Sequence, residues 1–399
     1  MKKLGLFALV MGLVMAFALP AFSFTYEGAK EGKLYIGGSA VTDLGYWNRS
    51  KEFAAAGWGG NSDQTQLIFD LTRATQLRTS FEMGNAGAYF ELGYGRDNIA
   101  AQKQTEAANG ADKSWAYNYA ETRRIYGYYK FGNCEFRAGK DTGSFTALYP
   151  AQMIGYNNNG HIVLVGWGSL WDDRSVQARF SQDISKTFGY QVSIIQPAVY
   201  AEKPAATNID SYAVLPRMDA MFKLNFGVVS LFPAVSFQTV KWDNLPSGAD
   251  DSLTTWAAQL PLKVLAGPFT GLFSVGMGQN ISGQYSATES AFQKYGRTAD
   301  GKIKNTTGIF GFIDLSYTAG PVTPHLIFGY DQAKNDDIYV GDKSNTRLAY
   351  VANVFYKVSP NFTIIPEFGY YDYGKNPAVV GNPDIGKEWL GGVQFNFSF

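Results

Sequence analysis

The sequence comprises 399 residues, and its 34 Lys+Arg are balanced by 34 Asp+Glu. A hydrophobic content of 46% with a net charge of +0 excludes a disordered chain, and the charge balance excludes a strongly basic nucleic-acid-binding protein. Aromatic residues reach 16%, whereas charged residues are only 17%, against about 25% in a typical soluble domain. One cysteine allows neither an intrachain disulfide nor a Cys-based zinc site, and two histidines leave little material for His-dependent catalysis.

The first residues resemble a secretory signal peptide. Two lysines are followed by an uncharged apolar run, Leu4–Leu19. Ala21-Phe22-Ser23 then supplies the small-x-small pattern after which signal peptidase cleaves, and no cysteine follows that would mark a lipoprotein. We therefore expect residues 1–23 to be a signal peptide, residues 24–399 to be the mature protein, and the protein to be exported.

The mature part alternates with period two. No stretch approaches the roughly 20 apolar residues of a helical membrane span. Segments of about ten residues alternate instead, and the last of them is Val393, Phe395, Phe397 and Phe399 against Gln394, Asn396 and Ser398. Aromatic side chains gather at the segment ends, as they do at a lipid–water boundary. A soluble β-sandwich remains the alternative, but the pattern favours a transmembrane barrel, closed because lipid tolerates no open sheet edge.

In chain order, the alternation predicts about sixteen strands. They span residues 33–47, 66–83, 87–96, 122–131, 134–141, 174–181, 188–197, 216–226, 228–240, 254–266, 269–280, 308–319, 322–331, 346–358, 362–373 and 387–399. Short connections such as Gly132-Asn133 and Gly267-Pro268 alternate with long ones rich in Gly, Asn, Asp and Lys. The expected fold is all-β: one antiparallel transmembrane β-barrel over residues 24–399, with short periplasmic turns and long extracellular loops.

The alternation also assigns faces. Most charged side chains share one parity, which we assign to the lumen because Arg or Lys facing lipid at mid-depth costs about 2–4 kcal/mol. The positions assigned to the lumen include Asp70, Arg78, Glu82, Glu91, Arg124, Lys130, Glu135, Arg137, Arg179, Arg217, Asp219, Lys223, Gln259, Lys263, Asp314, Arg347, Asn353, Lys357 and Glu367. Arg73 has the opposite parity, which a bulge near residue 73 or a contact with another subunit would explain. A polar interior in a barrel of this size is water-filled.

This order of strands, turns and loops, ending in a C-terminal Phe399, resembles the general trimeric porins of Gram-negative outer membranes. The resemblance covers the whole mature chain. It implies a place in the bacterial outer membrane, contact with outer-membrane lipid and lipopolysaccharide, a homotrimer, and small hydrophilic solutes as the cargo. The C-terminal strand is similar to the signal that the assembly machinery of such proteins reads.

In that family, the third long loop folds into the lumen and forms a constriction opposite a basic wall. The third long connection of this chain, residues 142–173, is unusually apolar and therefore costly to leave in solvent. We expect it to be the pore-constricting loop; capping the mouth or contacting a partner are the alternatives. The residues that match the basic wall by strand and facing are Arg78, Arg124, Arg137 and Arg179.

The residues expected to line the constriction on this loop are Tyr149, Tyr156, Asn157, Asn158, Asn159 and His161. The acidic loop tip of the family is missing, since asparagines stand there. A basic wall facing a neutral loop should favour small anions modestly, although acids in the lumen partly offset the arginines.

The sequence thus predicts an outer-membrane porin for passive diffusion of small hydrophilic solutes, with a mild anion preference. We expect no catalytic residues, no cofactor, no metal site and no nucleic-acid partner. One alternative is a substrate-selective porin for a sugar or phosphate, with Tyr35, Tyr89, Tyr126 and Tyr128 as a candidate stacking track. A second is an outer-membrane hydrolase, since a serine and a histidine such as His325 could meet from distant strands.

Overall fold

The computed structural model describes residues 24–27, 32–52, 65–72, 74–96, 118–154, 168–170, 174–197, 211–243, 245–281 and 296–399. Their strands are β1 (Phe24–Glu27), β2 (Gly32–Arg49), β3 (Thr65–Leu71), β4 (Gln76–Met83), β5 (Ala86–Arg96), β6 (Asn118–Phe131), β7 (Cys134–Asp141), β8 (Ser175–Asp183), β9 (Phe188–Ile195), β10 (Ser211–Phe226), β11 (Val229–Leu231), β12 (Ala234–Trp242), β13 (Ser252–Ala266), β14 (Phe269–Gln279), β15 (Gly296–Arg297), β16 (Ile303–Lys304), β17 (Thr307–Tyr317), β18 (Val322–Lys334), β19 (Ser344–Ser359), β20 (Phe362–Asp372) and β21 (Lys387–Ser398). Within these ranges, no helix has the length and apolar character needed to cross a membrane.

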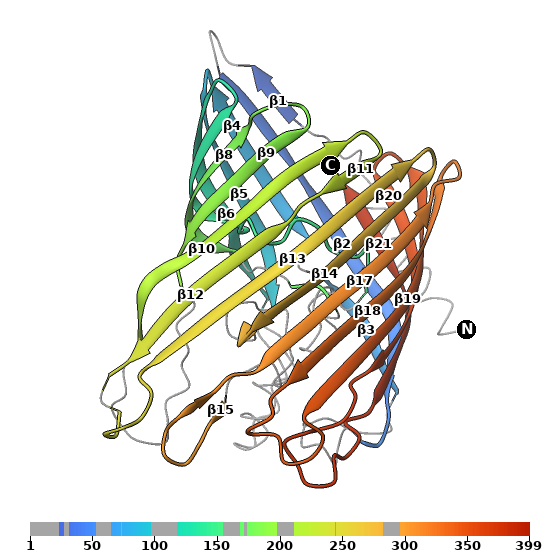
Figure 1. Ribbon diagram of the computed structural model, residues 1–399. Coiled ribbons are helices and arrows are strands. Elements are labelled where there is room, and N and C mark those ends of the chain that lie inside the picture. The colour runs from blue at the N-terminus through green and yellow to red at the C-terminus, as the bar shows by residue number, and fades with distance from the viewer. Residues whose placement is uncertain are drawn as a thin grey trace, which may run out of the picture.

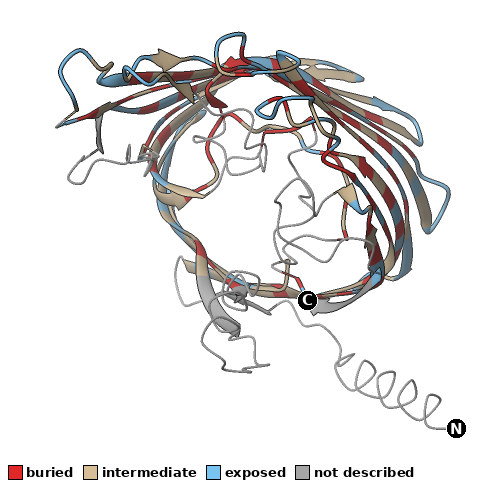
Figure 2. Cartoon of the chain, turned by 90° about the horizontal axis from the view of Figure 1, so that it is seen from below, coloured by how far each residue is buried: buried red, intermediate tan, exposed pale blue. Residues whose placement is uncertain are grey.

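The strands form one antiparallel sheet that closes on itself (Figures 1 and 2). Each strand pairs with the next along the ring, and β21 returns to β2, where Ser39–Arg49 pair with Ser398–Glu388. β3 and β4 share one position in the wall, as do β11 and β12, and β1 is a short addition beside β2. The described residues therefore make a closed barrel of 16 strands, which confirms the predicted all-β antiparallel fold.

The wall beside β2 contains a bulge. Residues 72–75 lie opposite only residues 40–41 of β2. Thr75 fills the gap, since its Oγ1 accepts a hydrogen bond from Val41 N (2.9 Å) and donates one to Val41 O (3.1 Å). Because two extra residues are inserted, the flanking strands β3 and β4 keep the same face parity. The bulge falls where the sequence suggested one, while Arg73 itself lies outside the described residues.

Side chains that face outward are mostly apolar and exposed, whereas those that face the lumen are mostly polar and buried. On β12, exposed Val235 and Phe237 alternate with buried Ser236 and Gln238. This is the reverse of a soluble protein, in which the large apolar side chains are the buried ones. A continuous apolar belt around a closed wall fits an apolar surrounding such as the lipid of a bilayer.

The short turns lie at one end of the barrel and the long connections at the other (Figure 1). Tight turns of this kind need positive φ angles, which glycine adopts without strain. Five turn glycines have φ between 57° and 74°: Gly84, Gly132, Gly227, Gly267 and Gly320. Phe399 ends the chain at the short-turn end, where its carbonyl accepts a hydrogen bond from Gly38 N (2.7 Å).

At the long-connection end, the β15–β16 hairpin is tied to the connection that precedes β13. Asp250 Oδ2 accepts a hydrogen bond from Ile303 N (2.8 Å), and Asp250 Oδ1 lies 3.2 Å from Lys302 Nζ. The hydrogen bond from the Ile303 backbone and the lysine ammonium hold the pKa of the Asp250 carboxyl below its usual value. These two connections therefore support each other at this end of the barrel.

Candidate functional site

The connection after β7 runs into the lumen and along the inner wall (Figure 2). Near its start, the hydroxyls of Ser144 and Ser193 on β9 form a hydrogen bond, and the amide of Gln259 on β13 donates one to Phe145 O. Buried Phe145 and Leu170 then pack against a lumen-facing apolar cluster that contains Met221, Ala234, Ala257 and Phe310. The start of this segment and Leu170, near its end, are thus both fixed by contacts with the wall.

Further along the same segment, residues 151–154 are held by carboxylates of the wall. Asp314 Oδ2 on β17 accepts a hydrogen bond from Ala151 N (2.8 Å). Glu367 on β20 accepts two more, from Met153 N (2.7 Å) and Ile154 N (2.9 Å). Both acids are almost fully buried. Their negative charge is therefore directed at the loop backbone and not at the open lumen.

Residues 153 and 154 of this segment lie at the seam between β21 and β2, the last and first strands of the ring. Gln394 on β21 donates to Met153 O (2.9 Å) and to Asp43 Oδ1 on β2 (2.9 Å). Ile154 is fully buried. A Cβ atom added to Gly392 would lie 2.7 Å from Leu44 O, 2.8 Å from Gly45 Cα and 3.1 Å from Ile154 Cδ1, so glycine at that position allows close approach of both β2 and the isoleucine. The loop thus bridges β20, β21 and β2.

Ile154 also belongs to an apolar cluster inside the lumen. The cluster contains Trp47, Ile154, Ile327, Ala333, Tyr339, Ala349, Val351, Tyr371, Tyr373, Ile385 and Leu390. These residues come from β2, from β18–β21 and from the connections after β18 and β20. Burying this much apolar surface stabilises the loop by the hydrophobic effect, which favours a fixed position over a mobile one.

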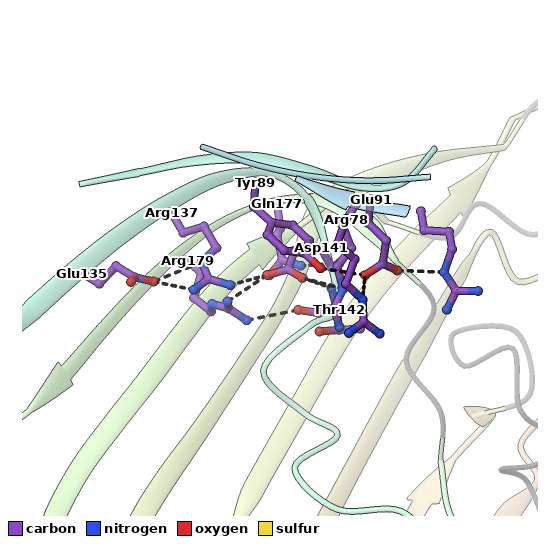
Figure 3. Close-up of polar contacts among 11 residues, drawn as sticks. Arg78, Tyr89, Glu91, Glu135, Arg137, Asp141, Thr142, Gln177 and Arg179 are labelled. Atoms are coloured by element: carbon purple, nitrogen blue, oxygen red, sulfur yellow. Dashed lines mark hydrogen bonds and ion pairs between the residues drawn. The ribbon is translucent and has the colours of Figure 1, made fainter. Parts of the chain in front are cut away.

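The arginines of the predicted basic wall lie on β4–β8 (Figure 3). Three of them surround Asp141, at the end of β7. Its carboxylate oxygens lie 3.3 Å from Arg124 Nε, 2.7 Å from Arg137 Nη1 and 2.9 Å from Arg179 Nη2. Arg179 Nη1 also donates to Thr142 O (3.2 Å), so the cluster includes the start of the inward loop.

A second cluster surrounds Glu91 on β5. Its carboxylate oxygens lie 2.8 Å from Arg123 Nε and 3.7 Å from Arg78 Nε, and they accept a hydrogen bond from Tyr89 Oη (2.9 Å). The sequence missed Arg123, because strict alternation places it on the lipid side. The β5–β6 register shifts at this point, so that Arg124 pairs with Glu91 and Arg123 is the extra residue of a bulge.

The two clusters carry an excess of positive charge. They bring together Arg78, Arg123, Arg124, Arg137 and Arg179 with the carboxylates of Glu91, Glu135 and Asp141. Arg78 and Arg124 are the most open members, with 49% and 30% of their side chains exposed. These two arginines therefore present the positive charge that a solute in the lumen would meet.

The lumen tyrosines on β5 and β6 contact protein groups on their ring faces. The rings of Tyr89 and Tyr126 stack with their centroids 5.2 Å apart, and Arg137 Cζ lies 4.2 Å from the centroid of Tyr126. Lys130 Nζ lies 4.9 Å from the centroid of Tyr128, and Tyr128 Oη donates to Glu82 Oε1 (2.7 Å). Tyr126 thus contacts both the ring of Tyr89 and the guanidinium of Arg137. These contacts favour a role for the tyrosines in holding the arginines in place over the alternative of a sugar-stacking track.

The structure describes only part of the predicted constriction residues. Tyr149 lies on the inward segment and is about half-exposed. The other residues named from the sequence lie outside the described residues: Tyr156, Asn157, Asn158, Asn159 and His161.

His325, the histidine considered for a hydrolase, lies on β18. Its Nδ1 is 2.9 Å from Asp314 Oδ1, and its ring lies 4.9 Å from that of Phe355. The cross-strand neighbour Ser316 donates instead to Thr270 O (3.4 Å). Within the described ranges, no serine hydroxyl bonds to His325, and no group of His, Cys, Asp and Glu is arranged to hold a metal ion.

No protein-family model and no curated protein sequence matches the chain. Solved structures do match. The outer membrane channel DcaP of Acinetobacter baumannii is similar with a TM-score of 0.66 over 94% of this chain and 99% of that chain, at 16% identity. The anion-selective porin from Comamonas acidovorans is similar with a TM-score of 0.55 over 92% of this chain and 100% of that chain, at 12% identity. The chain has the porin fold.

A third porin-like barrel, the trimer form of the outer membrane protein OmpT of Vibrio cholerae, gives a TM-score of 0.55 over 93% of this chain and 100% of that chain, at 11% identity. At such identities the porin fold is what the likeness establishes. The function of this chain has to be argued from its own lumen.

Proposed function

We propose that the chain is a porin: an outer-membrane channel through which small hydrophilic solutes diffuse passively, with a preference for anions. The proposal rests on one observation: two arginines are open to the lumen, whereas two acids of the wall are buried. Arg78 and Arg124 are the most open of the arginines described on β4–β8, whereas Asp314 on β17 and Glu367 on β20 are buried and occupied by loop N–H groups. A solute in the open part therefore meets mainly positive charge, which attracts anions and repels cations.

The membrane setting follows from the outer surface. The exposed apolar belt suits outer-membrane lipid and lipopolysaccharide, and the short turns would face the periplasm with the long loops outside. Export would use residues 1–23 as a signal peptide. Assembly as a homotrimer agrees with the trimer form of the OmpT barrel, which has the same fold.

Residues 142–173 are the proposed constriction. Within their described part, residues 145–154 lie against β13, β17, β20 and β21, so the narrowed passage would lie between this stretch and the arginines of β4–β8. Tyr149 would line the loop side, together with Tyr156, Asn157, Asn158, Asn159 and His161. No chemical step is involved, because selection depends on width and charge alone.

The test is the reversal potential of the purified protein in a planar bilayer with a KCl gradient. We expect large ohmic conductance steps and a reversal potential on the anion-selective side. Replacing Arg78→Gln and Arg124→Gln together should shift the reversal potential toward cations, since both exposed positive charges are lost. Unchanged selectivity in this double variant would show that these side chains do not border the narrowest part.

The matched control is the double variant Lys130→Gln and Lys357→Gln. It removes the same charge from exposed positions beside the short turns, far from the loop. We expect a much smaller shift. Current that is blocked by phosphate or by a sugar would instead identify a substrate-selective porin, and a sealed barrel with esterase activity would identify a hydrolase.

A further inference from the structure

A glycine makes room for Arg123 inside the lumen. A Cβ atom added to Gly93 on β5 would lie 2.7 Å from Arg123 Cγ and 3.2 Å from Arg123 Nε, and closer still to Arg123 Cδ. The aliphatic part of the arginine therefore lies directly over the Gly93 backbone, and its guanidinium ends at Glu91. The bulge in β6, the glycine and the carboxylate together fix this side chain in one place.

Two arginines compete for Glu91. Arg123 is close, at 2.8 Å, and its side chain is 4% exposed; Arg78 is more distant, at 3.7 Å, and borders the open lumen. Removing one partner of a buried ion pair is strongly destabilising, because the remaining charge is left uncompensated. Without Arg123, the buried Glu91 carboxylate would therefore draw in the nearest other cation, and that cation is Arg78.

We propose that Arg123 is a positioning residue for selectivity: it neutralises Glu91 and so keeps Arg78 available to passing anions. This inference rests on the proposed anion-conducting function. Arg123 is too buried to meet a solute itself, so its effect on permeation passes through Arg78. The bulge thus adds Arg123 to the lumen, where it pairs with Glu91 and so leaves Arg78 available to anions.

The decisive variant changes no charge. Gly93→Ala forces Arg123 away from Glu91, and we expect the anion-to-cation permeability ratio to fall by about twofold, as for the single variant Arg78→Gln. The control is Gly127→Ala on β6, where the nearest atom to an added Cβ is 3.8 Å away. This control should keep the wild-type reversal potential. Circular dichroism and conductance of each variant report whether the barrel has formed.

A double-mutant cycle separates positioning from simple loss of charge. If Arg123 acts through Arg78, then Arg123→Gln should lower the permeability ratio in the wild type but add little to Arg78→Gln. Arg123→Lys, which keeps the charge beside Glu91, should preserve most of the anion preference. Additive effects of the two Gln variants, or equal reversal potentials for wild type and Gly93→Ala, would overturn this inference alone. A cation-selective wild type would overturn the proposed function, whereas the shift caused by Gly93→Ala is measurable in either case.

Discussion

Replacing Ile154 by aspartate should release the inward loop and widen the channel. Ile154 is fully buried in the apolar cluster with Trp47 and Leu390. A carboxylate in that position would lose its hydration without gaining a partner, and its backbone N–H already donates to the carboxylate of Glu367. Leaving the wall restores the hydration of the carboxylate, so we expect the loop to detach. We expect single-channel conductance to rise by about twofold and liposomes to admit larger sugars.

Tyr149→Asp provides the matched control for this prediction. It introduces the same charge on the same loop, but at a side chain that is already about half-exposed. The loop should stay in place, so the sugar size limit should keep its wild-type value, while the added negative charge should lower the anion preference. If Ile154→Asp leaves both conductance and the sugar size limit at their wild-type values, the loop does not determine the width of the channel.

Replacing Val192 by arginine should strongly destabilise the barrel in lipid. Val192 lies in the middle of β9 and is exposed on the outer surface. An arginine there would face the hydrocarbon of the bilayer, at a cost of about 2–4 kcal/mol in the free energy of unfolding. The measurement is urea unfolding of the protein in lipid vesicles, followed by tryptophan fluorescence.

The neighbouring change Gln191→Arg is the control, because residue 191 has the opposite parity and faces the lumen. It places the same side chain one residue away in a polar, hydrated interior. We expect only a small change in the free energy of unfolding. Equal destabilisation by the two arginines would contradict the assignment of inner and outer faces on which the membrane setting depends.

Most of the fold could be predicted from the sequence, because each strand meets two different surroundings and so alternates along its length. β7 spans Cys134–Asp141 as predicted, and β14 ends one residue before its predicted end. The turns were equally readable, since glycines such as Gly132 and Gly267 adopt positive φ angles there. These signals are local, and they need no knowledge of distant contacts.

The clusters in the lumen could be predicted only in part, because they depend on bulges and on distant segments. Consecutive Arg123 and Arg124 in one membrane strand are a signal of a bulge, since strict alternation would place one of them in lipid. The burial of lumen-facing Ile327 and Val351 has no such signal. It arises from packing with the cluster of Ile154, a residue far away in the sequence.

The wall residues that hold the inward loop come from both ends of the chain. Met153 O accepts a hydrogen bond from Gln394, a residue 241 positions further along the chain, and Gln394 also donates to Asp43 near the start. Contacts of such long sequence separation form late in folding, after the intervening chain is ordered. We therefore expect the channel to pass through a wide, unconstricted stage during its insertion, and to acquire its sieving width only when the last strand has joined the first.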